Sequence, residues 1–276
     1  MRAWIDKLAF NFIEWLTCDV DRPPEIPLSD FADICQALRP GDVLLLEGRS
    51  RVSKVISTIT RSRWTHAALY IGYFNDIKIT EQRKRVIESY QANQQDQLII
   101  ESVMGKGVII SPLSSLRQEH IRICRPTGLL PKDVNRVIAC AIGGLGFEYD
   151  TRQILDLARF LFPWGILPRR WHSTLFTYKA GVPTRLSCSR LLAESFASVY
   201  FPILPHFLRD DSGKLIFIRR NPQLFTPSDF DYSPFFETIK YPIIKFTDGF
   251  NYRHLAWVDD VVSNNEKKSR TVERNK

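Results

Sequence analysis

The sequence predicts an α+β domain in which a β-sheet packs against a helix that carries a cysteine. Residues 65–72 alternate in polarity and are rich in residues that favour a pleated surface, which predicts a short strand. Residues 186–200 repeat their apolar positions at helical spacing after a set of start signals, which predicts a helix. With 276 residues and 44% apolar content, the chain can bury one large core.

The predicted strand at 65–72 places a histidine near its start. Side chains alternate across a strand, so Ala67, Leu69 and Ile71 share one face, while His66 lies on the other. A single histidine on a strand most often has only a structural role. A functional role for His66 therefore depends on a partner elsewhere in the chain.

The predicted helix at 186–200 supplies a candidate partner. Ser187 is suited to the N-cap, which puts Cys188 in the first turn. Unpaired backbone N–H groups and the helix dipole favour a thiolate at that position. A histidine nearby would lower the thiol pKa further and relay its proton. Alternatively, Cys188 is a small buried residue that packs the helix, and only its pairing with His66 separates the two interpretations.

Five short motifs occur along the chain in a definite order: Arg39–Val43, the strand with His66, residues 98–108, residues 146–150, and the helix that opens at Ser187. This order resembles the circularly permuted papain-like enzymes of the NlpC/P60 superfamily, specifically the YaeF/YiiX group of amidases, peptidase family C92. The resemblance covers roughly residues 38 to 200. It implies a permuted papain-like fold: an antiparallel, partly barrel-like sheet with the nucleophile helix packed against it.

The resemblance also implies a catalytic triad of Cys188, His66 and Glu101. It places the acid just before a Gly-x-Gly-Val turn, as Glu101 stands before residues 105–108. Residues 86–89 form a similar Val-Ile-Glu-Ser stretch, so Glu88 remains the alternative acid. His172 is the alternative base.

Four further residues are expected to contact substrate: Tyr149, Ser187, Arg190 and Trp64. Tyr149 matches a tyrosine of the family. Arg190 departs from the family, which more often has Glu or Lys after the Cys-Ser pair, and it is suited to a substrate carboxylate or phosphate.

Charge and cysteine content restrict the partners and the compartment. Lys and Arg exceed Asp and Glu by 38 to 30, a net charge of +8, which favours an anionic membrane as a peripheral contact. We expect no nucleic-acid partner, because no basic run outside residues 154–180 is interleaved with aromatics as a nucleic-acid groove requires. Five widely spaced cysteines without a C-x-x-C pair argue against disulfides and zinc, so we expect no metal or cofactor, and we expect Cys35 and Cys140 in the core. The absence of a long apolar run and of a secretory pattern predicts a cytoplasmic protein, peripheral to the membrane at most.

The chain divides into four parts. Residues 1–37 hold an amphipathic helix at 2–17 and a linker, and residues 38–220 form the papain-like domain. Within that domain, the aromatic and arginine-rich segment 154–180 reads as a lid over an acyl-binding cleft or as a membrane contact through Trp164 and Trp171. Residues 221–262 cover the domain, and the charged tail 263–276 is predicted to be disordered.

Other elements follow from local patterns. Strands are predicted at 42–46, 86–89, 99–102, 108–110, 121–124 and 215–218, and a polar hairpin at 75–85. Helices are predicted at 28–38 beginning at Ser29, at 50–60, and at 132–142 led by Pro131.

The function that follows is cysteine-dependent hydrolysis or acyl transfer on a small-molecule amide, ester or thioester, with an acyl-lipid or N-acyl or peptide amide as substrate. Two alternatives stay open. One is a non-catalytic lipid- or membrane-binding module on the same fold. The other is an endopeptidase acting on peptidoglycan-derived peptides.

Overall fold

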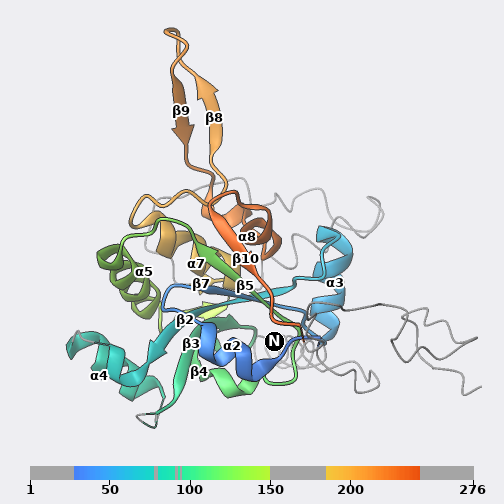
Figure 1. Ribbon diagram of the computed structural model, residues 1–276, viewed down its shortest axis with the longest axis vertical. Helices are drawn as coiled ribbons and strands as arrows, with labels where there is room; N and C mark the ends of the chain where they lie inside the picture. Colours follow the sequence, from blue (N-terminus) through green and yellow to red (C-terminus); the bar gives the residue numbers. More distant parts are fainter. Residues whose placement is uncertain (1–27, 78–79, 91–92, 94, 150–184, 243–276) are drawn as a thin grey trace, which may run out of the picture.

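The computed structural model describes residues 28–77, 80–90, 93, 95–149 and 185–242, and its centre is a six-stranded antiparallel sheet (Figure 1). The strand order is β10-β5-β1-β2-β3-β4. The strands are β1 Val43–Leu46, β2 His66–Tyr73, β3 Gln97–Val103, β4 Gly107–Pro112, β5 Ile121–Pro126 and β10 Phe236–Ile239. β4 and β10 form two separate edges, so the described strands make an open sheet, and the closure that a partly barrel-like sheet implies is not observed among them.

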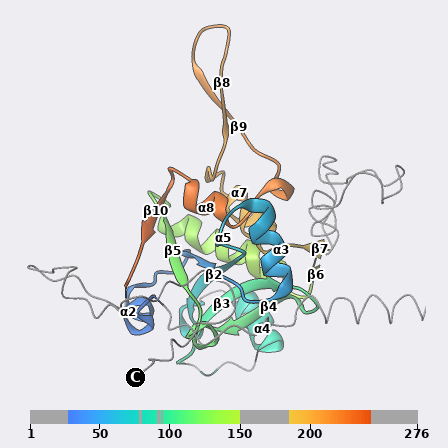
Figure 2. The same cartoon turned by 90° about the vertical axis from the view of Figure 1, so that its right-hand side faces the viewer.

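Helices cover both faces of the sheet. α5 (Pro131–Gly143), α7 (Cys188–Ala197) and α4 (Thr80–Ser89) lie on one face, and α2 (Phe31–Ala37) lies on the other (Figures 1 and 2). The alternation predicted for β2 is confirmed, because Ala67, Leu69 and Ile71 belong to one core cluster while Ala68 and Tyr70 belong to the other. The remaining helical segments are α3 Arg51–Thr60, α8 Ser228–Tyr232, η1 Phe74–Asp76, η2 Leu113–Leu116 and η4 Pro222–Leu224.

A buried ion pair between Asp42 and Arg125 joins the start of β1 to the end of β5. Asp42 is 1% exposed and accepts hydrogen bonds from Arg125 Nε at 2.9 Å and Nη2 at 2.7 Å. The carboxylate also accepts from the backbone N–H of Arg39 at 2.9 Å. These contacts satisfy a charge that burial would otherwise make very costly.

Three sequence predictions about local structure were wrong. The polar hairpin predicted at 75–85 is not observed, because residues 74–76 form η1 and Thr80 begins the helix α4. Residues 86–89 end the helix α4 and do not form a strand, because the preceding residues are strong helix formers and only Val86 of this helix is buried. This places Glu88 on an exposed helical surface. The helix predicted from Ser29 is capped instead by Asp30, whose carboxylate accepts from the N–H groups of Ala32 and Asp33. The predicted strands at 42–46, 99–102, 108–110, 121–124 and 215–218 and the helices at 50–60 and 132–142 are confirmed to within a few residues.

Two small sheets complete the fold. β6 (Glu148–Tyr149) pairs in parallel with β7 (Arg185–Leu186), directly before α7. β8 (His206–Arg209) and β9 (Leu215–Ile218) form a hairpin that extends away from the body (Figure 1). The segment after this hairpin does more than cover the domain, since it supplies β10 and the buried rings of Phe225, Phe230 and Phe236.

The cysteines differ in their surroundings. Cys140 is exposed, contrary to the predicted core position, and its sulfur lies at the edge of the contact between α5 and α7, 4.0 Å from the carbonyl oxygen of Glu194, while Cys35 is half-buried. Among the described residues, no helix has the length and apolar character needed to cross a bilayer. The predicted helix at 2–17, the 154–180 segment with Trp164, Trp171 and His172, and the tail at 263–276 all fall outside the described residues.

Candidate active site

His66 and Glu101 form a pair across two adjacent strands. β2 and β3 are antiparallel neighbours in which Ala68 lies opposite Glu101, so the side chains of His66 and Glu101 lie on one face within reach of each other. Nε2 of His66 and Oε2 of Glu101 are 2.7 Å apart. The side chains are 22% and 10% exposed, respectively. A carboxylate in this position fixes the imidazole tautomer and orientation.

The second oxygen of Glu101 is held by a residue that the sequence analysis missed. Ser111 on β4 donates its hydroxyl to Glu101 Oε1 at 2.7 Å. Ser111 lies opposite Ile99 on β3, two residues from Glu101, so both side chains share a face. Side chains alternate along residues 107–112, so Ser111 could have been placed on the same face as Glu101 if the pairing of β3 with β4 had been known. The sequence alone does not reveal which residues of these two strands lie opposite each other.

Cys188 is the first residue of α7, and its sulfur lies beside the His66 ring. Because Nε2 of His66 is engaged by Glu101, Nδ1 is the ring nitrogen left for the thiol, and Cys188 and His66 lie close enough to shift each other's pKa. The backbone N–H of Ala67 also helps to lower the pKa of this thiol. The strand β2 thus brings both a ring and a backbone N–H close to the sulfur at the start of α7.

Ser187 occupies the N-cap position of α7, but its hydroxyl does not cap the helix. The backbone has extended N-cap geometry, and its carbonyl accepts from the N–H of Leu191 at 2.9 Å. The buried Ser187 hydroxyl has no hydrogen-bond partner among the described residues. An unsatisfied buried hydroxyl costs about 1–3 kcal/mol, which a ligand with an acceptor would relieve.

The three side chains shift one another's protonation. Burial lowers the pKa of His66, but the adjacent thiolate and then the Glu101 carboxylate outweigh it and raise that pKa to about 10. Burial raises the pKa of the Cys188 thiol, but the positive charge and hydrogen bond of His66 bring it below its usual value. Burial likewise raises the pKa of Glu101, and His66 and Ser111 lower it below the usual range. The arrangement therefore favours a thiolate–imidazolium pair backed by a carboxylate.

Residues 37–159 match the family model described as the permuted papain-like amidase enzyme, YaeF/YiiX, C92 family. This segment belongs to the C92 amidase family. The chain is accordingly an enzyme of the cysteine-hydrolase type. The matched segment contains His66 and Glu101 and ends before Cys188.

One solved structure similar to this chain is the metalloprotein YiiX from Escherichia coli O157:H7, with 16% identity and a TM-score of 0.44, covering 74% of this chain and 98% of that chain. No curated protein matches the sequence. Within the described residues of the amidase, no group of three or more His, Cys, Asp or Glu side chains is arranged to hold a metal ion.

A pocket of about 340 Å³ opens beside His66 and Glu101. Tyr149 lines it, because β6 pairs with β7 next to the start of α7. Gly107 permits this approach: it has φ +78°, and a Cβ there would lie 2.2 Å from the carbonyl oxygen of Phe147. The remaining wall includes the ion pair of Arg49 with Glu119, 3.8 Å apart. It also mixes apolar and hydroxyl side chains: Leu46, Val52, Val103, Ile56, Met104, Leu116, Ser50, Ser53, Thr65, Ser102 and Ser115.

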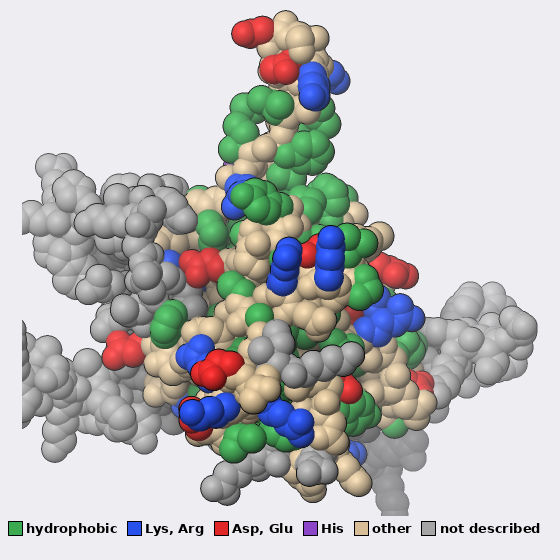
Figure 3. All heavy atoms as spheres, turned by 90° about the vertical axis from the view of Figure 1, so that its left-hand side faces the viewer, with side chains coloured by type: hydrophobic (Ala, Val, Ile, Leu, Met, Phe, Trp, Pro, Cys, Tyr) green, Lys and Arg blue, Asp and Glu red, His purple; other side chains and the backbone are tan. Residues whose placement is uncertain are grey.

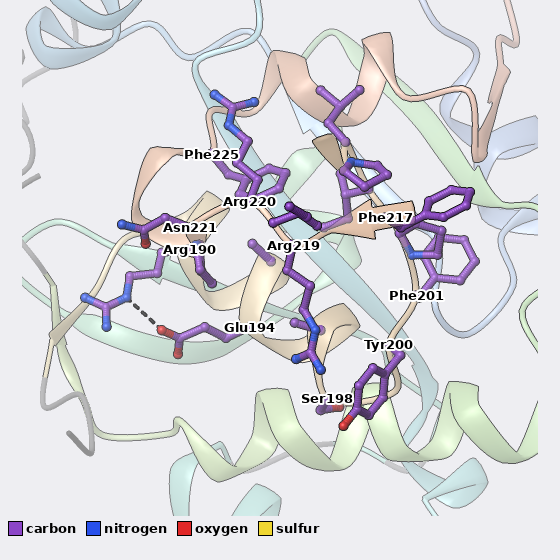
Figure 4. A pocket seen from close by; sticks show the side chains of 18 residues that line it. Arg190, Glu194, Ser198, Tyr200, Phe201, Phe217, Arg219, Arg220, Asn221 and Phe225 are labelled. Carbon is purple, nitrogen blue, oxygen red and sulfur yellow. Dashed lines mark hydrogen bonds and ion pairs between the residues drawn. The ribbon is translucent and has the colours of Figure 1, made fainter. Parts of the chain in front are cut away.

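Trp64 and Arg190 do not line this pocket. Trp64 donates its indole N–H to Asp231 Oδ2 at 3.2 Å, and Arg122 stacks 4.7 Å from the ring centroid. Arg122 in turn pairs with Asp231 at 2.6 Å, so Trp64 ties the segment containing α8 to β5. Arg190 is buried on α7 and lines a different pocket, of about 850 Å³, where its Nε is 2.8 Å from Glu194 Oε1 (Figure 4). Glu88, on α4, also stands apart from His66.

Proposed function

We propose that this C92 amidase cleaves an amide, ester or thioester bond through a Cys188–His66–Glu101 triad. The single observation that supports it most is the chain of contacts from sulfur to imidazole to carboxylate, with His66 and Glu101 only 2.7 Å apart. Two elements far apart in sequence, β2 and α7, contribute to it. Nucleophile, base and orienting acid are recognised by such geometry rather than by their order in the chain.

In the proposed acylation step, the Cys188 thiolate attacks the carbonyl carbon of the substrate and a tetrahedral oxyanion forms. The His66 imidazolium then donates its Nδ1 proton to the leaving amine or alcohol as the carbon–heteroatom bond breaks. Glu101 stays ionised and stabilises the positive ring throughout. In deacylation, His66 removes a proton from water, which attacks the thioester and releases the acid.

The oxyanion requires donors close to the sulfur. The backbone N–H of Cys188 is the first candidate, because the initial N–H groups of a helix have no intrahelical acceptor. The buried hydroxyl of Ser187 is the second candidate, since it has no partner among the described residues and is adjacent to the nucleophile. Substrate binding would then satisfy a polar group that is unsatisfied in the free enzyme.

For the substrate, the pocket beside His66 supports an acyl-lipid or N-acyl amide whose reacting end is small. Its apolar side chains suit a hydrocarbon group, while its serine and threonine hydroxyls suit a polar substituent near the carbonyl. Pockets of a few hundred Å³ hold a small ligand or one part of a larger one.

A panel of electrophilic acyl probes tests this proposal. Amide-, ester- and thioester-type probes are applied to wild type, Cys188→Ala and His66→Ala, and adducts are located by peptide mass spectrometry. The proposal predicts labelling at Cys188 by at least one probe type, loss in Cys188→Ala and a strong decrease in His66→Ala. Cys140→Ala is the matched control, because Cys140 is an exposed cysteine outside the site, and its labelling should equal wild type.

The same panel separates the proposal from a binding module. Failure of every probe to label Cys188, together with retained binding of an acyl-lipid, would favour a non-catalytic lipid-binding protein. Labelling that persists at full strength in Cys188→Ala would reject the assigned nucleophile.

A further inference from the structure

The β8–β9 hairpin stands out from the body as an arm that the proposed chemistry does not use. It leaves the domain just after α7 and projects into solvent in both ribbon views (Figures 1 and 2). All eight strand residues are exposed. An isolated two-stranded hairpin is marginally stable in water, so an arm of this kind gains from a partner.

Both faces of the arm are apolar. Phe207 lies opposite Phe217 on one face, with ring centroids 5.0 Å apart, and Leu208 lies opposite Ile216 on the other. Phe217 is 56% exposed and Leu208 is 50% exposed, so neither face is covered by the described part of the chain. In the space-filling view, apolar side chains run along the arm (Figure 3). Charged side chains lie at its outer end, and positively charged side chains lie where it joins the body.

The base of the arm continues into a pocket of about 850 Å³ (Figure 4). Phe217 forms one side of it, Phe201 another, and α7 its floor. Tyr200, beside the pocket, is 76% exposed and carries the guanidinium of Arg219 at 4.0 Å from its ring centroid. The arm and this pocket therefore form one continuous surface.

The chemistry of the arm disfavours a membrane as its partner. The turn at its end, residues 210–214, contains Asp210, Asp211 and Lys214, with Arg209 at the end of β8 beside it, and these charges would enter the bilayer first. Both outer strand edges also present unpaired backbone groups, which hydrocarbon cannot satisfy. A protein surface can cover the apolar faces, pair the edges and leave the charged turn in water.

We propose that the arm is the interface through which two copies of this chain form a two-fold symmetric dimer. An arm of this kind is self-complementary, because each has two apolar faces and two free edges to offer an identical arm. Antiparallel packing about a two-fold axis would bring the end of each arm to the base of the other. There Asp211 would approach Arg219 of the partner copy, and Lys214 would approach Glu194 of the partner copy.

The available area fits a small, reversible interface. One face of the arm carries Phe207, Leu215 and Phe217, each about half exposed. If each offers a full surface of roughly 200 Å², that face contributes on the order of 300 Å² per copy. Tyr200 and the wall of the pocket at the base add to it, so the interface falls below the ~800 Å² per partner of a standard stable one and should dissociate on dilution.

The test is the molar mass of the full chain, measured by light scattering over a range of concentrations. Wild type should have twice the chain mass and dissociate on dilution, while Phe207→Lys/Phe217→Lys should have the chain mass throughout. Ile87→Lys is the matched control, because Ile87 is 54% exposed on α4, away from the arm, and this variant should remain dimeric. Far-ultraviolet circular dichroism should be unchanged in both variants, since the arm lies outside the core.

A photo-reactive benzoyl-phenylalanine at position 217 supplies the second readout. Irradiation should give a covalent dimer at concentrations where wild type is dimeric. A wild-type molar mass equal to that of a single chain at every concentration would overturn the proposal. So would cross-linking of position 217 only within one chain, which would assign the arm to another segment of the same molecule. Flotation of monomer with phosphatidylglycerol vesicles that is lost in Phe207→Lys/Phe217→Lys would overturn it in favour of a membrane.

Discussion

Replacing Glu101 by Gln isolates the contribution of the carboxylate to the charged state of His66. The substitution preserves shape and removes one negative charge 2.7 Å from Nε2. The pKa of His66 is raised from 6.5 to about 10, and Cys188 contributes more to that rise than Glu101 does. We therefore assign to Glu101 the smaller share of that rise in pKa, and each pKa unit corresponds to about 1.4 kcal/mol.

The sign of the effect follows from which form the carboxylate stabilises. A raised pKa means that the protonated ring is favoured, with the gain present below the ordinary pKa and lost as pH rises through about 10. In Glu101→Gln the pKa of His66 should therefore fall. The basic limb of the pH–rate profile should move to lower pH with it. The acidic limb, which reports protonation of the Cys188 thiolate while the ring is already charged, should move much less.

The assay is an NMR titration of the His66 ring, assigned with a His66→Gln variant, alongside the pH dependence of kcat/KM with a probe substrate. Glu88→Gln is the control, because Glu88 is an exposed glutamate on α4. A His66 pKa that is the same in wild type and Glu101→Gln would refute the reasoning. An equal shift in Glu88→Gln would also refute it, because the cause would then be net charge rather than the contact.

Three further substitutions test other parts of the account. Ser111→Ala removes the 2.7 Å hydrogen bond to Glu101, and we expect kcat to fall about tenfold and the basic limb to shift down, with KM little changed, as measured by steady-state kinetics across pH. Asp42→Ala leaves Arg125 without its buried partner and should destabilise the fold by about 3–5 kcal/mol in urea unfolding, whereas a loss below about 1 kcal/mol would contradict the role of the pair. Trp64→Phe removes the indole hydrogen bond to α8 and should reduce stability by about 1 kcal/mol without changing KM, and a large rise in KM would instead restore Trp64 as a substrate contact.

The sequence predicted the parts of the fold in which local pattern and burial agree. β2 is apolar on both faces because both faces are covered, and α7 shows helical spacing because one side packs on the sheet. His66, Glu101 and Cys188 were found by their place in a family order, and spacing alone would not have paired them.

The rest depended on information that local sequence does not carry. Residues 86–89 are β-branched and apolar at their start, yet the helix formers before them extend a helix through Ser89. The contact of Ser111 with Glu101 could be recognised only from the register in which β3 and β4 pair. The strand β10 comes from a segment more than a hundred residues after its neighbour β5, so no local pattern indicates that they pair.

The ultraviolet absorbance of the thiolate, recorded as a pH titration of wild type minus Cys188→Ser, tests the central claim most directly. Burial raises the pKa values of Cys35, Cys124 and Cys140, whereas that of Cys188 is lowered by His66, so the thiolate of Cys188 should appear first among these four. The account predicts a midpoint well below the ~8.5 of a free cysteine, moving up in a His66→Ala background. A midpoint at or above that value, unchanged without His66, would contradict it.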